Sequence, residues 1–116
     1  MRYLPLLHEI KVRHVKHGVP YRKVDHMEIE RLSFIVTPQD RVEDFITTDE
    51  AVWDPWLRQQ RGYLRKTYQR YPNGRVDIRL FWATKRDLDA ASKSPEIPVL
   101  DVRHQSSFLG VYQRLP

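Results

Sequence analysis

A histidine on an apolar stripe is the best candidate for acid–base chemistry in this sequence. Leu100, His104 and Phe108 recur at intervals of four residues, which places them on one face of a helix. An imidazole titrates near neutral pH, so His104 is a candidate general base. The alternative interpretation is a buried histidine that is held in the core by a hydrogen bond.

Three tryptophans could form the wall of a cavity for an aromatic ligand. Trp53 and Trp56 flank Pro55 in the stretch VWDPW, and Trp82 ends the run RVDIRLFW. Each indole also buries a large apolar area, so these residues would serve equally well as core. The two interpretations overlap, because the wall of a ligand cavity is usually part of the core.

Other polar residues give weaker signals. Tyr68 and Arg79 could orient a carbonyl or phenolate of such a ligand, or could form cross-strand or dimer contacts instead. His8, His14 and His17 could gather a metal ion, but no carboxylate pattern or helical spacing accompanies them, so we expect no metal site. Phosphate-binding loops, nucleophile elbows and paired-carboxylate motifs are absent from the sequence, which therefore predicts no cofactor.

The composition narrows the class of protein. The chain has 116 residues, enough for one domain, and no cysteine, which excludes disulfides, zinc–thiolate sites and a cysteine nucleophile. Its net charge is +5, but bases alternate with acids, which favours a solvated surface over a nucleic-acid-binding one. No apolar run approaches the roughly 20 residues of a membrane helix, and the start MRYLPLLHEI lacks a signal-peptide cleavage site. We therefore expect a cytoplasmic protein that binds neither nucleic acid nor membrane.

Hydrophobic spacing indicates the elements that would position these residues. Residues 1–25 are basic and contain two prolines and a glycine, so we expect an N-terminal extension with at most a short strand at 10–15. The run HMEIERLSFIV, residues 26–36, predicts a strand with apolar side chains on both faces and a change of phase near Glu30 and Arg31.

A long helix should follow this strand. Thr37 would be its N-cap, Pro38 its first residue and Gly62 its left-handed stop, with a bend at Pro55. Its apolar stripe consists of Val42, Phe45, Ile46, Val52, Trp53, Trp56 and Leu57.

The second half of the chain predicts a hairpin, further helices and a last strand. Residues 63–71 and 75–82 read as strands joined by Asn73-Gly74, since both turn residues accept positive φ. Thr84 can cap a helix that two prolines, at 95 and 98, would break. We expect a further helix after the second proline, ending at Gly110, and a last short strand over 111–115.

The predicted order is strand, helix, hairpin, helix, strand. This order is typical of an α+β fold of the ferredoxin-like, split βαβ type, with a four-stranded antiparallel sheet and helices on one face, here over residues 26–116. Phe34, Leu64 and Phe81 would lie on the open face of the sheet, which a small domain should not leave wet. We therefore expect a homodimer with a two-fold contact.

Three stretches stand out as a set: VTPQDRVEDFITTDEAVWDPWLRQQRGYLRKTY, LFWATKRDLDAASKSPEIP and VYQRLP. Together they resemble a family of small uncharacterised bacterial proteins, best known from cyanobacteria. That family is similar to the antibiotic-biosynthesis-monooxygenase-like group of the dimeric α+β barrel superfamily. The resemblance covers about residues 26–116, and the matching residues are Asp49, Trp53, Pro55, Gly62, Leu64, Lys66, Trp82, Ile97 and Pro98.

The resemblance implies a homodimer whose two sheets pack into a barrel, with a ligand cavity between each sheet and its own helices. The sequence departs from haem-degrading members, because the first strand lacks their Asn and His104 lies far downstream of their helical His. It also departs from many relatives of the closer family, which carry a basic residue where this chain has Phe81. We therefore expect a protein that binds an apolar or aromatic small molecule and, if it is an enzyme, a cofactor-independent monooxygenase. The alternative is a non-catalytic module that docks on protein or nucleic acid through its basic N-terminal arm.

Overall fold

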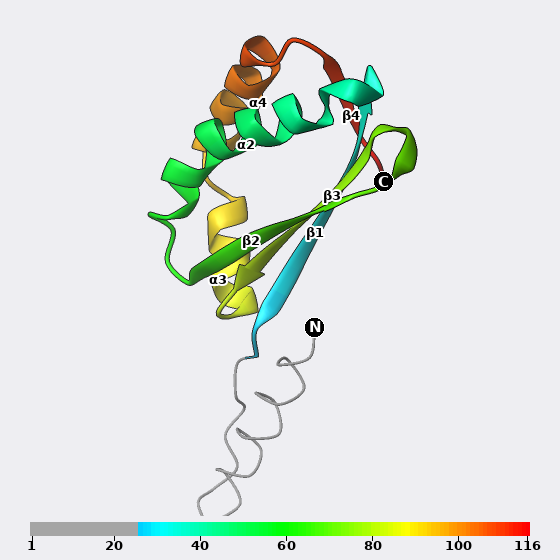
Figure 1. The fold of residues 1–116 in the computed structure, drawn as a ribbon. Coiled ribbons are helices and arrows are strands. Elements are labelled where there is room, and N and C mark those ends of the chain that lie inside the picture. Colours follow the sequence, from blue (N-terminus) through cyan, green and yellow to red (C-terminus); the bar gives the residue numbers. More distant parts are fainter. Residues whose placement is uncertain (1–25) are drawn as a thin grey trace, which may run out of the picture.

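The structure is a computed structural model that describes residues 26–116 (Figure 1). The predictions made for residues 1–25, namely the extension, its short strand and its three histidines, lie outside the described residues. The described elements are β1 (Glu28–Thr37), a 3₁₀ turn (Gln39–Arg41), α2 (Val42–Leu57), β2 (Tyr63–Arg70), a second 3₁₀ turn (Pro72–Gly74), β3 (Arg75–Trp82), α3 (Lys85–Ser92), α4 (Glu96–Ser107) and β4 (Val111–Arg114).

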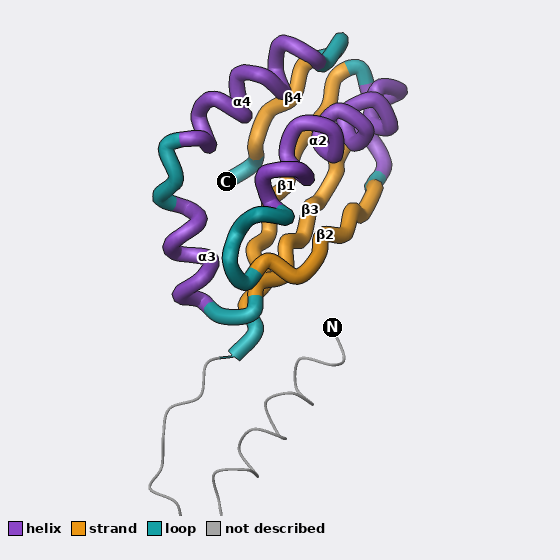
Figure 2. Tube along the Cα trace, turned by 90° about the vertical axis from the view of Figure 1, so that its left-hand side faces the viewer, coloured by secondary structure: helices purple, strands orange, loops and turns teal. Residues whose placement is uncertain are grey.

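The four strands form one antiparallel sheet in the order β2-β3-β1-β4. Figures 1 and 2 show α2, α3 and α4 on the same side of this sheet. The predicted α+β, ferredoxin-like arrangement is therefore confirmed. None of the helices formed by residues 26–116 is long and apolar enough to cross a membrane.

Strand β1 alternates without the predicted change of phase. It pairs with β3 residue for residue from Glu28 to Ile35. Glu30, Leu32 and Phe34 all line the space under the helices, so a carboxyl group occupies a position where the pattern favours an apolar residue. The placement of Phe34 on the open face was wrong: its ring packs on Phe45 of α2, with the ring centres 5.3 Å apart.

Helix α2 begins later than the sequence predicted. Thr37 does not cap it, because this residue pairs with Val111 of β4 and extends β1. Pro38 leads into the 3₁₀ turn, and α2 begins at Val42 without a side-chain cap. Glu43 and Asp44 lie in its first turn, where negative charge offsets the positive end of the helix dipole.

Helix α2 also ends earlier than predicted, at Leu57, two residues beyond Pro55. Pro55 lacks only the amide that would bond to the Ala51 carbonyl, and the helical pattern continues past it, since the Arg58 amide bonds to the Asp54 carbonyl at 3.0 Å. The following amides of Gln59 and Gln60 bond three residues back, at 3.1 and 3.0 Å, in the tighter 3₁₀ pattern. Gly62 does take the left-handed conformation, with φ of 81°, but in the loop that enters β2.

The hairpin and the cap of α3 agree with the sequence. Asn73 and Gly74 have φ of 63° and 83°, and the Thr84 hydroxyl accepts a hydrogen bond from the backbone amide of Asp87 at 3.0 Å. Inner-face residues of β3, from Val76 to Trp82, form the floor of the core with the helices above.

Helix α4 contains the proline that was expected to precede it. Pro98 lies in the first turn of α4, where backbone amides have no partner inside the helix, so a proline is tolerated there. The helix ends at Ser107, and Gly110 lies in the loop before β4. Leu100 and His104 form the buried side of α4, as the apolar stripe predicted.

Candidate functional site: a cavity between the sheet and its helices

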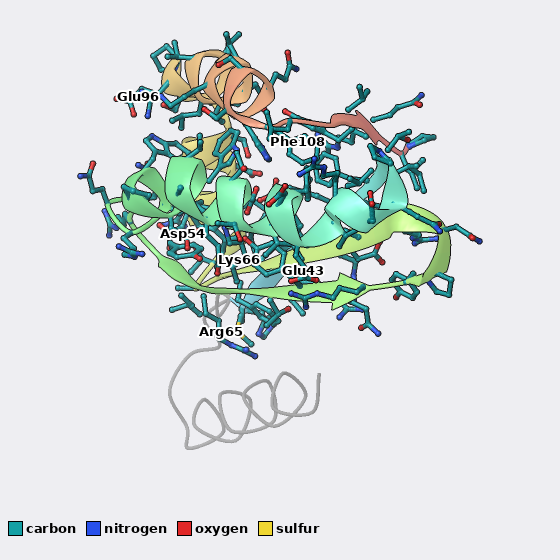
Figure 3. The ribbon with its side chains drawn as sticks, turned by 45° about the horizontal axis from the view of Figure 1, so that its top comes forward. Glu43, Asp54, Arg65, Lys66, Glu96 and Phe108 are labelled. Carbon is teal, nitrogen blue, oxygen red and sulfur yellow. The ribbon has the colours of Figure 1, made fainter. Side chains whose placement is uncertain are left out.

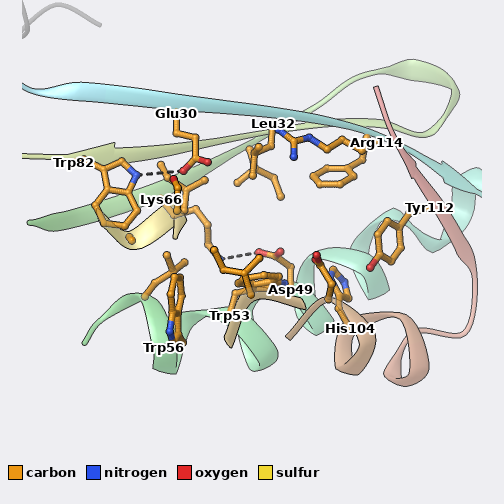
Figure 4. Close-up of a pocket in the computed structure, with 18 of the residues that line it drawn as sticks. Glu30, Leu32, Asp49, Trp53, Trp56, Lys66, Trp82, His104, Tyr112 and Arg114 are labelled. Carbon is orange, nitrogen blue, oxygen red and sulfur yellow. Dashed lines mark hydrogen bonds and ion pairs between the residues drawn. The ribbon is translucent and has the colours of Figure 1, made fainter. Parts of the chain in front are cut away.

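A cavity of about 510 Å³ lies between the inner face of the sheet and the three helices (Figure 4). Leu32 and Phe34 of β1 and Ile78 and Leu80 of β3 contribute apolar side chains from the sheet. Its volume falls in the range of about 300–1,000 Å³ that is typical of small-molecule sites. The cavity therefore has the size and the apolar lining of a ligand-binding site.

All three tryptophans of the chain line this cavity. Trp53 and Trp56 project from α2 and pack edge to face, with the ring centres 6.1 Å apart. Trp82 ends β3 and is 2% exposed, and its indole Nε1 donates a hydrogen bond to Glu30 Oε1 at 3.3 Å. The tryptophans thus belong to the core and to the cavity wall at the same time.

His104 also lines the cavity, from the buried side of α4. It is 3% exposed and lies between the rings of Phe45 and Tyr112, with ring centres 5.0 and 4.8 Å away. Burial lowers the pKa of His104, although the charge of Asp49 and a hydrogen bond to the backbone of Phe45 both raise it. Among residues 26–116 its Nε2 has no hydrogen-bond partner. The bond to Phe45 therefore involves Nδ1–H, and Nε2 of the neutral ring is left as an acceptor.

The hydroxyl of Tyr112 is the second buried polar atom without a partner in the described part of the chain. Burial raises the pKa of Tyr112, and the Gln105 side chain approaches the hydroxyl without reaching bonding geometry. Figure 4 shows Tyr112 beside His104 at one end of the cavity. An unsatisfied buried group costs about 1–3 kcal/mol, so two of them at one place need an explanation.

A buried ionic cluster forms another part of the wall, and sequence reasoning did not assign it a role. Lys66 Nζ of β2 lies 2.7 Å from Asp49 Oδ2 and also contacts Asp54, and the Tyr68 hydroxyl donates to Asp49. The side chains of Lys66 and Asp49 are 5% and 9% exposed. Figure 3 shows Asp54 and Lys66 between α2 and the sheet.

A signal for this cluster was present in the sequence. Asp49 follows Phe45 and Ile46 and precedes Val52 at helical spacing, so it lies on the apolar stripe of α2. A charged residue on a buried stripe requires a partner. The identity of that partner, Lys66, depends on how β2 pairs in the sheet.

The other two predicted ligand contacts lie outside the cavity lining. Tyr68 reaches the site only through its hydrogen bond to Asp49. Arg79 projects from the outer face of the sheet, where it is the cross-strand neighbour of Arg31 and Thr67. The structure thus brings His104 together with the three tryptophans and leaves Arg79 on the opposite side.

Metal binding has no support in this region. No three His, Cys, Asp or Glu side chains within residues 26–116 gather in a way that could hold a metal ion. The remaining charged groups of the lining are Glu30, Asp101 and Arg114. Burial raises the pKa of Glu30 and of Asp101, while the positive charge of Arg114 acts in the opposite direction on both.

Comparison with known proteins identifies the fold. No protein-family model matches the chain, and no curated protein matches it. Among solved structures, SnoaB, a cofactor-independent oxygenase from Streptomyces nogalater, is 14% identical with a TM-score of 0.52, over 80% of this chain and 93% of SnoaB. A candidate antibiotic biosynthesis monooxygenase from Nitrosomonas europaea is 11% identical with a TM-score of 0.52, over 82% and 91%. A similar candidate from Caulobacter crescentus is 12% identical with a TM-score of 0.53, over 78% and 89%. The chain therefore shares the fold of the antibiotic-biosynthesis-monooxygenase-like proteins.

Proposed function

We propose that this protein binds an apolar or aromatic small molecule in the cavity and contacts one polar group of that molecule with His104 and Tyr112. The observation that carries the proposal is the pair of buried, unpartnered atoms, His104 Nε2 and Tyr112 Oη, at one end of a tryptophan-lined cavity. Nε2 is an acceptor and the tyrosine hydroxyl can donate, so one ligand hydroxyl could bond to both.

The same geometry supports a catalytic role as the finer proposal. A neutral His104 with a free Nε2 can accept a proton from an acidic ligand group, as a general base does. The anion of an electron-rich aromatic compound can reduce dioxygen directly. A ring CH₂ and O₂ then give C=O and water, so a cofactor-independent monooxygenase needs no further reductant. The likeness of fold to SnoaB supports this by analogy only.

We propose further that two copies associate through the outer face of the sheet, in the cytoplasm. This face carries the half-buried Ile29 and Ile35, together with Arg31 directly opposite Arg79. Phe81 lies on the same face but is already 1% exposed, with the guanidinium of Arg65 4.1 Å from its ring centre. Like charges that face each other across two strands are unfavourable unless another group neutralises them. A second copy would cover the apolar residues of the face and could supply that group.

Ligand binding is testable by intrinsic fluorescence, because all three tryptophans line the cavity. We expect 1-naphthol to change the fluorescence saturably and to bind more tightly than 1-methylnaphthalene. Tyr112→Phe and His104→Gln should each reduce that difference, by roughly tenfold for the loss of about 1.4 kcal/mol. Arg79→Gln, on the outer face, is the control and should bind as the wild type does.

If no naphthalene derivative bound saturably, the cavity would not be a site for aromatic ligands. For catalysis, oxygen consumption should accompany turnover of a bound anthrone and should disappear in His104→Gln. An unchanged rate in that variant would exclude His104 as the base.

A further inference from the structure

We infer that Glu30 gives the cavity a preference for a positively charged group, so that the preferred occupant is an aromatic amine in its ammonium form. The inference rests on the proposed function, because it names the chemical class of the ligand for the same cavity. It concerns the other end of the cavity from His104 and Tyr112, where Glu30 and Trp82 lie (Figure 4).

The carboxyl group of Glu30 has unused bonding capacity. Within the described part of the chain, the one hydrogen bond of its side chain is the 3.3 Å contact that Oε1 accepts from Trp82 Nε1. No lysine or arginine in residues 26–116 forms an ion pair with it. A carboxylate offers about four acceptor sites, so the rest of this group is open to a donor in the cavity.

The direction in which the pKa of Glu30 is shifted agrees with the lack of a cation beside its carboxyl group. Burial raises the pKa of Glu30 because the charged form has lost water, and the bond from Trp82 and the charge of Arg114 act in the opposite direction. An ammonium group next to Glu30 would replace the lost water and favour the charged carboxylate.

The remaining charges of the lining also favour a cation. Three carboxyl groups line the cavity, those of Glu30, Asp49 and Asp101, against two basic side chains, Lys66 and Arg114. Asp49 and Asp54 already bind Lys66, so the positive charge of Lys66 is neutralised within the protein. Helix α3 contributes only Ala91 and Ser92, which carry no charge. The lining is thus net acidic, although the chain carries a net charge of +5.

Two further features point the same way. Indole rings attract cations through their negative faces, and three of them line this cavity. His104 is 3% exposed, faces the same cavity, and its Nε2 is a second acceptor without a donor among residues 26–116. The unused acceptors at the two ends of the cavity, Glu30 and His104 Nε2, therefore favour a ligand with several hydrogen-bond donors. A carboxylate ligand would be repelled by Glu30 and Asp101, and Arg114 would be the one cation of the lining, within the part of the chain that the structure describes, left unpaired to attract it.

The test compares four ligands that differ in one substituent. They are 1-naphthylmethylamine, 1-naphthylmethanol, 1-methylnaphthalene and 1-naphthoate, each titrated against tryptophan fluorescence at low salt. We expect the amine to bind the wild-type protein at least tenfold more tightly than the alcohol, and the carboxylate to bind most weakly. Glu30→Gln keeps an oxygen for Trp82 and should reduce the amine and the alcohol to similar affinities. Glu28→Gln, on the same strand but outside the cavity lining, should keep the preference.

The affinity for the amine should also depend on pH through Glu30. Because the pKa of Glu30 is raised, its carboxylate is lost at a higher pH than usual as the solution is acidified. The affinity should therefore fall as pH drops through that raised pKa. The fall should be smaller in Glu30→Gln, where Asp101 and His104 are the lining groups that still take up protons.

The outcomes separate the two proposals. If none of the four compounds binds, the proposed function fails. If all four bind equally well, or the alcohol binds as tightly as the amine, the cavity is a site but this inference is wrong. The tightest binding by 1-naphthoate would also overturn it, since Arg114 would then set the preference. The wild-type comparison alone decides these cases, even if Glu30→Gln does not fold.

Discussion

Replacing Lys66 by methionine should destabilise the fold far more than breaking a similar ion pair on the surface. Lys66 Nζ lies 2.7 Å from Asp49 Oδ2 and contacts Asp54 as well, and its side chain is 5% exposed. Methionine fills a similar volume but leaves two carboxylates of α2 without their cation. Removing one partner of a buried pair costs about 3–5 kcal/mol, because the remaining charge stays buried and unpaired.

The structure supplies a matched control for this experiment. Arg70 of β2 binds Glu43 of α2 at 2.9 Å through Nη2, so it joins the same two elements with the same kind of ion pair. Its side chain and that of Glu43 are 50% and 69% exposed. Water and salt screen such a pair, so Arg70→Met should leave the stability almost unchanged.

Urea denaturation followed by tryptophan fluorescence measures both variants. With an m-value of about 1–3 kcal/mol/M, Lys66→Met should lower the urea midpoint by at least about 1 M. Adding Asp49→Asn to Lys66→Met should recover part of this loss, because one of the unpaired carboxylates is then neutral. If Lys66→Met and Arg70→Met gave equal midpoints, burial would not control the strength of these contacts, and the ionic cluster would have no role in holding α2.

Four other expectations are open to direct measurement. Gly62→Ala should lower the melting temperature by at least about 4 °C, because φ is 81° and a Cβ would lie 2.1 Å from Asp87 Oδ2; an unchanged melting curve would contradict this. Trp56→Ala should lower the free energy of unfolding by about 3–5 kcal/mol, whereas Trp82→Phe should mainly alter ligand binding through the lost bond to the Glu30 side chain. Chemical denaturation and ligand titration measure both variants, and an equal loss of stability in Trp82→Phe with unaltered binding would make Trp82 plain core. Because burial lowers the pKa of His104 below the unfolded value of 6.5, stability should be complete above pH 6.5 and fall as pH drops below it; His104→Gln should lack that part of the fall. Light scattering at micromolar concentration should give twice the 14.0 kDa of one chain, and a monomer would exclude the proposed dimer.

Local chemistry made part of the fold predictable. The turn at Asn73 and Gly74 follows from two residues that tolerate positive φ, and the cap at Thr84 follows from one hydroxyl and an amide three residues away. Each depends on neighbours within a few positions, so no knowledge of the rest of the chain is required. The alternation of β3 was equally clear, because its inner face is apolar without interruption from Val76 to Trp82.

Distant pairing explains what the sequence did not reveal. Thr37 has the right neighbours to begin a helix, but pairing with Val111 of β4 holds it in β1. Lys66 and Asp49 are 17 positions apart and meet only after β2 has paired and α2 has packed above it. The cavity itself was expected from the family resemblance, but that Lys66 and Asp49 form part of its wall follows only from this pairing. Glu30 was overlooked because a charged residue in an apolar pattern indicates a change of phase, not a side chain that faces the cavity.

The two edges of the sheet have a consequence for aggregation. An exposed strand edge offers unpaired backbone groups that can recruit a strand from another molecule. Here one edge is β4, which has only four residues, and the other is β2, which carries the exposed Arg65 and Arg70 and has an irregular register near Leu64. Short length, like charges and a local bulge all oppose the addition of a further strand. Fibre growth by edge-to-edge extension of this sheet is therefore disfavoured, and copies of the chain that associate should do so face to face.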